Sequence, residues 1–147
     1  LGDVYLSVGD WLNASRNYRE ALRLDPDLAV THHNLGVTYY RLHELDDARS
    51  EFELAIQLDP DLPAAHAGLG VIAFEQDRIT EALPAFQRAV ELDPQDEIAY
   101  FYLGLIYKEL GYHELAIDAF GRALGLSADP VVRQQAEWHL RELWGLP

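Results

Sequence analysis

The chain is 147 residues long, with 49% hydrophobic residues and 25 acidic against 11 basic side chains, which gives a net charge of −14. The apolar content supports a folded core, and the acidic excess has the wrong sign for binding the phosphate backbone of nucleic acid. The lack of cysteine excludes disulfides and cysteine-based zinc sites, and no apolar run is long enough to predict a membrane span.

Apolar residues recur every three to four positions along most of the chain, which is typical of amphipathic helices. We expect helices at about residues 1–8, 12–24, 28–41, 45–58, 62–75, 79–92, 96–109, 113–126 and 130–144. An Asp-Pro pair follows the second, fourth and sixth of these helices and ends them, because proline cannot continue a helix. Asp27 and Asp61 come next, and we expect them to cap the following helix or to lie in its first turn.

Short strings return every 34 residues. Leu-Asp-Pro begins at Leu24, Leu58 and Leu92, and Leu-Gly begins at Leu1, Leu35, Leu69 and Leu103. Between these strings lies a ladder of alanine, aromatic residue and alanine, found at Ala14, Tyr18, Ala21, Ala48, Phe52, Ala55, Ala82, Phe86, Ala89, Ala116, Phe120 and Ala123. Small residues let paired helices approach closely, and the aromatic residue fills the space beside them. The period therefore indicates stacked helix–turn–helix units.

With this period and this ladder, the chain resembles the tetratricopeptide repeat family over nearly its whole length. The resemblance implies an all-α fold, an α-solenoid of stacked helix–turn–helix hairpins that forms a right-handed superhelix. We expect one repeat domain over residues 1–147, with repeats at about 1–28 (truncated), 29–62, 63–96 and 97–130 and a capping helix at 130–144.

The sequence departs from the family pattern at several places. The tryptophan that is usual in the first helix is replaced by His32, His66 and Tyr100. A tyrosine near the end of that helix is present as Tyr39 and Tyr107 in other units, but the third unit has alanine at position 73. The last unit replaces Leu-Asp-Pro with a string that is two residues longer, at 126–130.

The last predicted helix matches no repeat. Its apolar stripe consists of Val132, Ala136, Leu140 and Leu143 and lies opposite polar residues, as expected of a helix that caps the stack. Trp138 lies off the stripe and Trp144 lies at its edge. We expect these tryptophans to pack on a neighbouring helix or to contact a partner.

The two histidines at 32 and 66 occupy the same place in successive units, so we interpret them as packing residues with a polar edge. Ligands on a helix need a spacing of three or four, and at that spacing His32 has Leu35 and Gly36. No hydrolase motif, phosphate-binding loop or cysteine–histidine pair is present in the sequence. We therefore expect no metal site, no cofactor and no catalytic residues.

The resemblance also implies a concave groove lined by the second, fifth, sixth, ninth, twelfth and thirteenth places of each first helix. In the second unit these are Val30, His33, Asn34, Val37, Tyr40 and Arg41. In the third they are Ala64, Ala67, Gly68, Val71, Phe74 and Glu75, and in the fourth Ile98, Phe101, Tyr102, Leu105, Lys108 and Glu109.

These residues exclude one binding mode and favour another. A clamp for a C-terminal carboxylate needs lysines, arginines and asparagines in the groove. Of these residues only Asn34 is at its expected place, so we do not expect such a clamp. The small residues of the third unit predict a recess that takes bulky apolar side chains of an extended peptide or a short helix, while Asn34 bonds its backbone. Gly68 costs its helix about 1 kcal/mol relative to alanine. Either close approach of this ligand or tight packing of neighbouring first helices explains that glycine.

The sequence thus predicts a non-enzymatic scaffold that binds an apolar or basic segment of a protein or peptide partner. Two alternatives stay open. The first is self-association into a homo-oligomer through the truncated first unit and the terminal tryptophans. The second is a repeat segment that presents substrates to the catalytic domain of a larger enzyme. We expect a soluble protein, in the cytoplasm rather than the periplasm.

Overall fold

The computed structural model describes residues 1–145, and its regular secondary structure there is entirely α-helical. The helices are α1 (Gly2–Ser7), α2 (Trp11–Leu24), α3 (Ala29–Arg41), α4 (Leu45–Leu58), α5 (Pro63–Glu75), α6 (Ile79–Leu92), α7 (Glu97–Glu109), α8 (His113–Leu126) and α9 (Pro130–Leu143). Every predicted helix end lies within one residue of the observed end, because the apolar period and the Asp-Pro pairs mark both limits.

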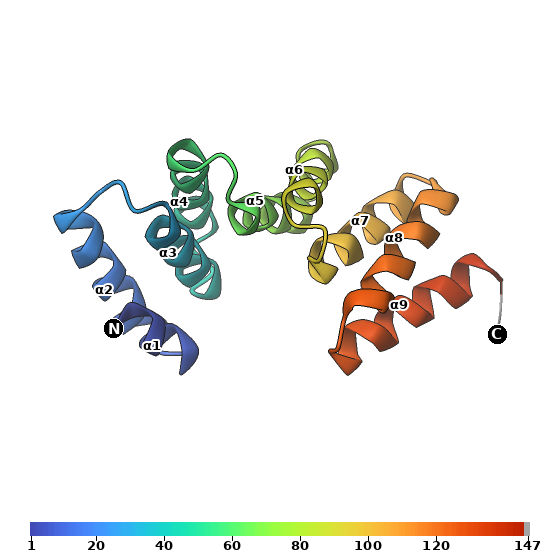
Figure 1. Ribbon diagram of the computed structural model, residues 1–147, viewed down its shortest axis with the longest axis horizontal. Coiled ribbons are helices and arrows are strands. Elements are labelled where there is room, and N and C mark those ends of the chain that lie inside the picture. Colours follow the sequence, from blue (N-terminus) through green and yellow to red (C-terminus); the bar gives the residue numbers. More distant parts are fainter. Residues whose placement is uncertain (146–147) are drawn as a thin grey trace.

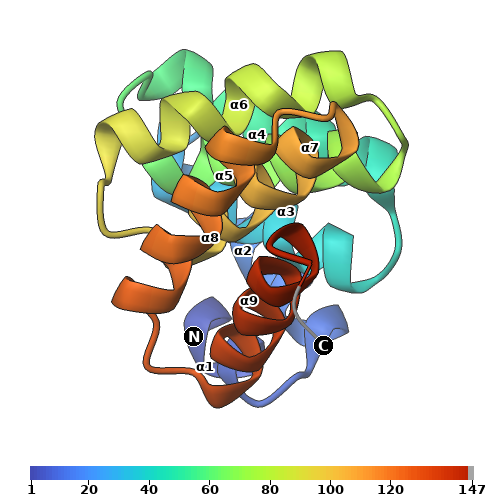
Figure 2. The same ribbon diagram turned by 90° about the vertical axis from the view of Figure 1, so that its right-hand side faces the viewer.

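The helices pair into hairpins that stack side by side. Each helix packs mainly against the helices before and after it in the sequence, with a weaker contact between α3 and α5 and between α7 and α9. In Figure 1 the stack forms an arc, in which α4 and α6 lie along the outer edge and α5 lies on the inner side. Figure 2, seen from the C-terminal end, shows α9 beside α8 at the end of the stack. This arrangement is the predicted α-solenoid.

A glycine and an aromatic residue hold each hairpin together. The rings of Tyr18, Phe52, Phe86 and Phe120 on the second helices are at most 5% exposed. A Cβ atom added to the facing glycine of the first helix would lie only 2.5 to 2.9 Å from the ring, at Gly2, Gly36, Gly70 and Gly104. Each of these glycines therefore lets a ring lie directly against the helix backbone, which accounts for the repeated Leu-Gly string.

The turn inside each hairpin needs a left-handed residue. Positive φ angles occur at Gly9 (77°), His43 (61°), Asp77 (59°) and Gly111 (77°), again 34 residues apart. Glycine adopts this conformation without strain, whereas histidine and aspartate carry a Cβ atom that disfavours it. Two of the four turns therefore adopt the left-handed conformation of the repeat without a glycine.

The prediction that Asp27 and Asp61 cap the next helices is wrong. The N-caps of α3 and α5 are Leu28 and Leu62, and neither forms a side-chain capping bond. Instead, the aspartates of Leu-Asp-Pro accept a hydrogen bond from the backbone N–H two residues later, as Asp59 does from Asp61 at 3.1 Å. The short aspartate side chain bonds this nearby N–H within the turn, so its role is to hold the linker between hairpins.

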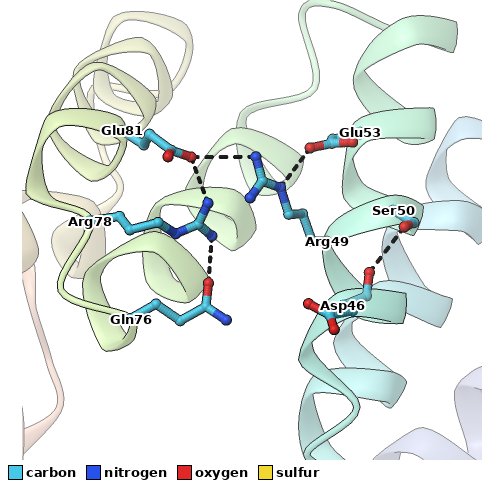
Figure 3. Close-up of polar contacts among 7 residues, drawn as sticks. All are labelled: Asp46, Arg49, Ser50, Glu53, Gln76, Arg78 and Glu81. Atoms are coloured by element: carbon cyan, nitrogen blue, oxygen red, sulfur yellow. Dashed lines mark hydrogen bonds and ion pairs between the residues drawn. The ribbon is translucent and has the colours of Figure 1, made fainter.

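In the third unit, which has alanine where other units have tyrosine, an ion-pair network lies beside Ala73. Ala73 lines a hollow of about 90 Å³ between α4 and α6. The Arg49 guanidinium donates to Glu53 at 2.8 Å and reaches Glu81 at 3.4 Å, and Arg78 donates to Glu81 at 2.8 Å (Figure 3). Two second helices are therefore linked by charged side chains above the small alanine.

The last helix caps the stack in a shifted register. Ala136 and Leu140 are 0% and 5% exposed, as Ala99 and Leu103 are at 0% and 4% in α7. The spacing between these matching residues is 37, three more than the repeat period. In α9 six helical residues precede Ala136, whereas in α7 two precede Ala99, and the linker before α9 is one residue shorter. Val132 and Leu143 are half-buried, so the predicted stripe faces α8.

Candidate peptide-binding groove

The floor of the groove rests on the buried aromatic residues of the second helices. The fifth-place side chain of a first helix lies against the ring of its own hairpin, and the sixth-place residue lies against the ring of the preceding hairpin. Ring centroids are 5.5 Å apart for His33 and Phe52, 5.6 Å for Phe101 and Phe120, and 4.8 Å for the stacked pair Tyr102 and Phe86. Core packing thus positions the groove residues.

Asn34 is bonded inside the protein. Its amide nitrogen donates to the Asp3 carboxylate at 3.0 Å, and the same carboxylate oxygen accepts the Tyr18 hydroxyl at 2.6 Å. Burial, together with Asp3, raises the pKa of Tyr18 above its ordinary value, so the hydroxyl stays a donor. Asn34 therefore links α3 to the first hairpin, which leaves its amide oxygen and one N–H for a peptide.

Gly68 faces a protein side chain. A Cβ atom at this position would lie 2.7 Å from the ring of Phe52, which also lies against Gly36 on the other side. Phe52 is 2% exposed, so the ring fills the space that a side chain at 68 would need. Tight packing accounts for this glycine without a ligand.

Polar and cation–π contacts also join α3 to its neighbours α5 and α2. The Tyr40 hydroxyl donates a hydrogen bond to the Glu75 carboxylate. Burial is the larger cause that raises the pKa of Tyr40, and this hydrogen bond is the second. The Arg41 guanidinium lies over the Trp11 ring, 5.9 Å from its centroid. The remaining predicted groove residues here, Val37, Ala67, Val71 and Phe74, are partly buried against the core.

The side chains at the second position of the first helices are exposed to solvent. Val30 is 58% exposed and Ile98 is 41% exposed, and Ala64 between them is exposed as well. They occupy equivalent positions at the start of three successive first helices, so they form an apolar line across α3, α5 and α7.

A pocket of about 490 Å³ opens where this surface reaches α9. It is lined by Phe101 and Leu105 of α7 and by Gln134, Gln135, Trp138 and His139 of α9. Lys108 lies beside it: its ammonium is 5.2 Å from the centroid of the Trp138 ring and 3.2 Å from the Nδ1 atom of His139, and it pairs with Glu142. The structure therefore brings the predicted residues of the fourth unit together with residues of the capping helix.

The 34-residue pattern does not assign the α9 residues to the groove. One sequence feature indicates that α9 resembles a first helix. Ala136 and Leu140 repeat the pair Ala99 and Leu103 at a spacing of 37 residues. In that register Trp138 and His139 take the places of Phe101 and Tyr102. His139 stacks on Phe120 with centroids 4.7 Å apart and planes 10° apart, as Tyr102 stacks on the ring before it. The tryptophans themselves pack little, at 58% and 55% exposed.

The histidines of the opening repeats are structural. The Nε2 atom of His32 lies 2.9 Å from the Pro26 carbonyl oxygen and its Nδ1 atom lies 2.6 Å from Glu51, while His66 makes the same carbonyl contact to Pro60 at 2.9 Å. Each ring therefore ties its first helix to the linker before it. Within residues 1–145 no group of three or more histidine, aspartate or glutamate side chains is placed to hold a metal ion.

Comparison with known families covers most of the chain. The family model described as "Tetratricopeptide repeat" matches residues 33–97 and 73–130, and the one described as "TPR repeat" matches residues 2–43. The chain belongs to the tetratricopeptide repeat family. Both the predicted family and the all-α solenoid fold are confirmed.

Solved structures of tetratricopeptide repeat proteins share the fold from end to end. One structure of MamA is 31% identical with a TM-score of 0.79, covering 99% of this chain and 80% of that one. Another MamA structure is 27% identical with a TM-score of 0.77 and covers 99% and 93%. YrrB, described as a TPR protein with an unusual peptide-binding site, is 25% identical with a TM-score of 0.79 and covers 98% and 73%.

A curated relative matches only in part. Tetratricopeptide repeat protein 8 of Caenorhabditis elegans is 38% identical over 50 residues, which are 34% of this chain and 10% of the relative. This chain spans a small fraction of that protein, so the match supports the repeat alone. Across the residues that the structure describes, no helix has the length and apolarity that crossing a membrane requires.

Proposed function

We propose that the chain is a non-enzymatic scaffold whose concave groove binds an extended or helical segment of a partner protein. The groove comprises the exposed second-place residues of α3, α5 and α7 and the fifth-, sixth- and ninth-place residues behind them. The observation that carries the proposal is the apolar line of Val30, Ala64 and Ile98, which leads to the pocket beside α9. YrrB, a relative of the same fold, is described as having a peptide-binding site.

A triple groove variant tests this function. Val30→Lys/Ala64→Lys/Ile98→Lys replaces three exposed side chains, so the fold is retained while the apolar line is lost. Ser50→Lys/Gln57→Lys/Gly121→Lys adds the same charge to exposed positions on the second helices α4 and α8 and is the matched control. Peptides selected by phage display on the native chain are then measured against all three proteins by fluorescence anisotropy.

We expect the selected peptides to bind the control as they bind the native chain, and to bind the groove variant at least about tenfold more weakly. Circular dichroism confirms equal helicity of the three proteins. Undiminished binding by the groove variant would move the interface to the second helices or to the ends of the stack and would contradict the proposal.

A specific observation also favours self-association as a second function. Residues 1–24 carry three acidic and three basic side chains, whereas residues 25–96 carry 15 acidic and four basic ones. Arg16, Arg19 and Arg23 line a hollow of about 610 Å³ on α2 together with Glu20, which pairs with Arg23 at 2.8 Å and leaves a charge of +2 on this face. A basic face at one end and an acidic middle are complementary between two copies of the chain.

Light scattering over a range of protein concentrations tests this second function. Association through charge predicts a mass that rises with concentration, falls with added salt, and stays that of a monomer in an Arg16→Glu/Arg19→Glu variant. A native mass that does not change with concentration would rule it out.

A further inference from the structure

We propose that the pocket between α7 and α9 is the anchor of the groove, which takes one bulky apolar side chain from a partner segment whose flanking residues are basic. This inference rests on the proposed peptide-binding function and specifies where the segment is held and by which chemistry. It concerns the pocket lined by Phe101, Leu105, Gln134, Gln135, Trp138 and His139.

The pocket is large enough for a bulky side chain and part of the backbone next to it. Its volume of about 490 Å³ lies within the range of roughly 300 to 1,000 Å³ that is usual for ligand pockets. Two aromatic rings, Phe101 and Trp138, and the Leu105 side chain supply its apolar walls. The amides of Gln134 and Gln135 lie at its edge, where they can bond the backbone of a segment that enters from the groove.

Contacts between aromatic rings connect the walls of the pocket to the core. Phe101 meets the buried Phe120 edge-on, with ring centroids 5.6 Å apart, and His139 stacks on the same ring at 4.7 Å. Trp138 in turn meets His139 edge-on at 4.7 Å. A chain of rings thus connects the exposed tryptophan to the core, so little side-chain entropy is lost when a ligand binds.

Lys108 decides that the anchoring side chain is neutral. Its ammonium lies 5.2 Å from the centre of the Trp138 ring and is already paired with Glu142. A lysine or arginine entering the pocket would be desolvated among apolar walls beside a cation that Glu142 already pairs, and a carboxylate would be desolvated there as well. An aliphatic or aromatic side chain meets neither penalty.

The residues on either side of the anchor are expected to be basic. Between residues 25 and 96, 15 side chains are acidic and four are basic. Three of those four are paired with acids, through the contacts Arg49–Glu53, Arg78–Glu81 and Arg88–Asp61. The net charge of residues 25–96 is −11, and the long-range attraction of this charge favours lysine and arginine on a segment that binds the groove.

Single amino-acid derivatives test the pocket directly. N-acetyl amides of leucine, phenylalanine, lysine and glutamate are titrated into the ¹⁵N-labelled chain, and the indole N–H signals of its three tryptophans are followed by NMR. Trp138→Phe assigns the Trp138 signal. We expect saturable shifts at Trp138 with the leucine and phenylalanine amides and none with the lysine and glutamate amides.

A matched pair of variants then connects the pocket to peptide binding. Trp138→Ala removes a wall of the pocket. Trp144→Ala removes a similarly exposed tryptophan that directly follows the same helix and does not line the pocket. We expect display-selected peptides to bind Trp138→Ala roughly tenfold or more weakly and Trp144→Ala as the native chain. The selected peptides should share one apolar residue flanked by lysine or arginine.

The outcomes separate this inference from the function on which it rests. Peptides that lose affinity for the triple groove variant but not for Trp138→Ala would overturn the anchor and leave groove binding intact. Saturable binding of the lysine amide, with no effect of the apolar amides, would overturn the assigned chemistry. Peptides that bind every variant equally would contradict the groove function as a whole, whatever the amides do.

Discussion

Phe52 shows how one ring can dictate two backbone positions. It is 2% exposed and lies between Gly36 of its own hairpin and Gly68 of the next, each of which would place a Cβ atom within 3 Å of it. The first glycine belongs to the repeat pattern and the second does not. Because the ring is held from both sides, it cannot move to accept a methyl group at either position.

Gly68→Ala is therefore expected to destabilise the protein. Alanine gains about 1 kcal/mol in helix propensity over glycine, but overpacking against a fixed ring costs about 1–3 kcal/mol. Gly121→Ala in α8 is the control, because a Cβ atom there meets nothing within 4 Å, and it should stabilise by about 0.5–1 kcal/mol. Urea denaturation measures both, and a stabilised Gly68→Ala would show that the ring is free to move.

His33 gives the stability a dependence on pH. Burial lowers its pKa below the ordinary value of 6.5, and its Nδ1 atom is buried without a hydrogen-bond partner. As the pH falls, the His33 imidazole therefore takes up a proton more readily in the unfolded chain than in the folded chain. The contribution of His33 is thus complete above about pH 6.5 and is lost as the pH falls toward the lowered pKa.

His33→Phe removes this dependence, since Phe101 occupies the same place in the fourth unit. Between pH 7 and pH 5 the free energy of unfolding of the native chain should fall faster than that of the variant. Other titrating groups, including His139, are common to both proteins and cancel in the difference. Parallel curves from chemical denaturation at each pH would show that His33 titrates alike in both states.

At the scale of the element, two hairpin turns contain backbone strain that a glycine would relieve. His43 and Asp77 hold φ angles of 61° and 59°, where Gly9 and Gly111 hold 77° in the other turns. At these φ angles a residue with a Cβ atom destabilises the fold by about 1–2 kcal/mol. Glycine avoids this strain, but it loses more conformational entropy on folding, which offsets part of the gain. The four turns have the same shape because the helices on either side pack alike.

His43→Gly is expected to stabilise the protein by about 0.5–1 kcal/mol, because the exposed turn keeps its shape and loses its strain. Gly111→Ala is the reciprocal change. A Cβ atom at 111 meets nothing within 4 Å, so a loss of about 1 kcal/mol there would come from the positive φ angle alone. Thermal unfolding followed by circular dichroism compares the two, and shifts of the same sign would contradict this account.

At the scale of the whole molecule, stability spreads from neighbour to neighbour. Contacts between helices far apart in the sequence are nearly absent among the described residues, so each hairpin depends on the ones beside it. The end helices then open most easily. The anchor pocket lies at one such end, and its rigidity depends on how firmly α9 is held.

Leu140→Ala tests this dependence. Leu140 is 5% exposed and packs against the α8 core, so its truncation should cost about 2–5 kcal/mol locally. We expect hydrogen exchange to accelerate in α9 and α8 while amides of α4 and α5 keep their native protection. Uniform acceleration along the chain would instead mean that the stack unfolds as one cooperative unit.

The sequence by itself determined the helices, their pairing and the family, because the period of 34 residues, the apolar spacing and the Asp-Pro pairs are local signals that each unit repeats. The resemblance to the family also predicted that the first helices line a groove. Only the tertiary structure decided which of those residues are free. Asn34 is bonded to Asp3, Gly68 faces Phe52, and the open pocket lies against α9 rather than in the third unit. Such contacts join side chains on neighbouring hairpins, and they depend on how the hairpins pack and on a three-residue shift of the last helix, neither of which a repeat pattern encodes.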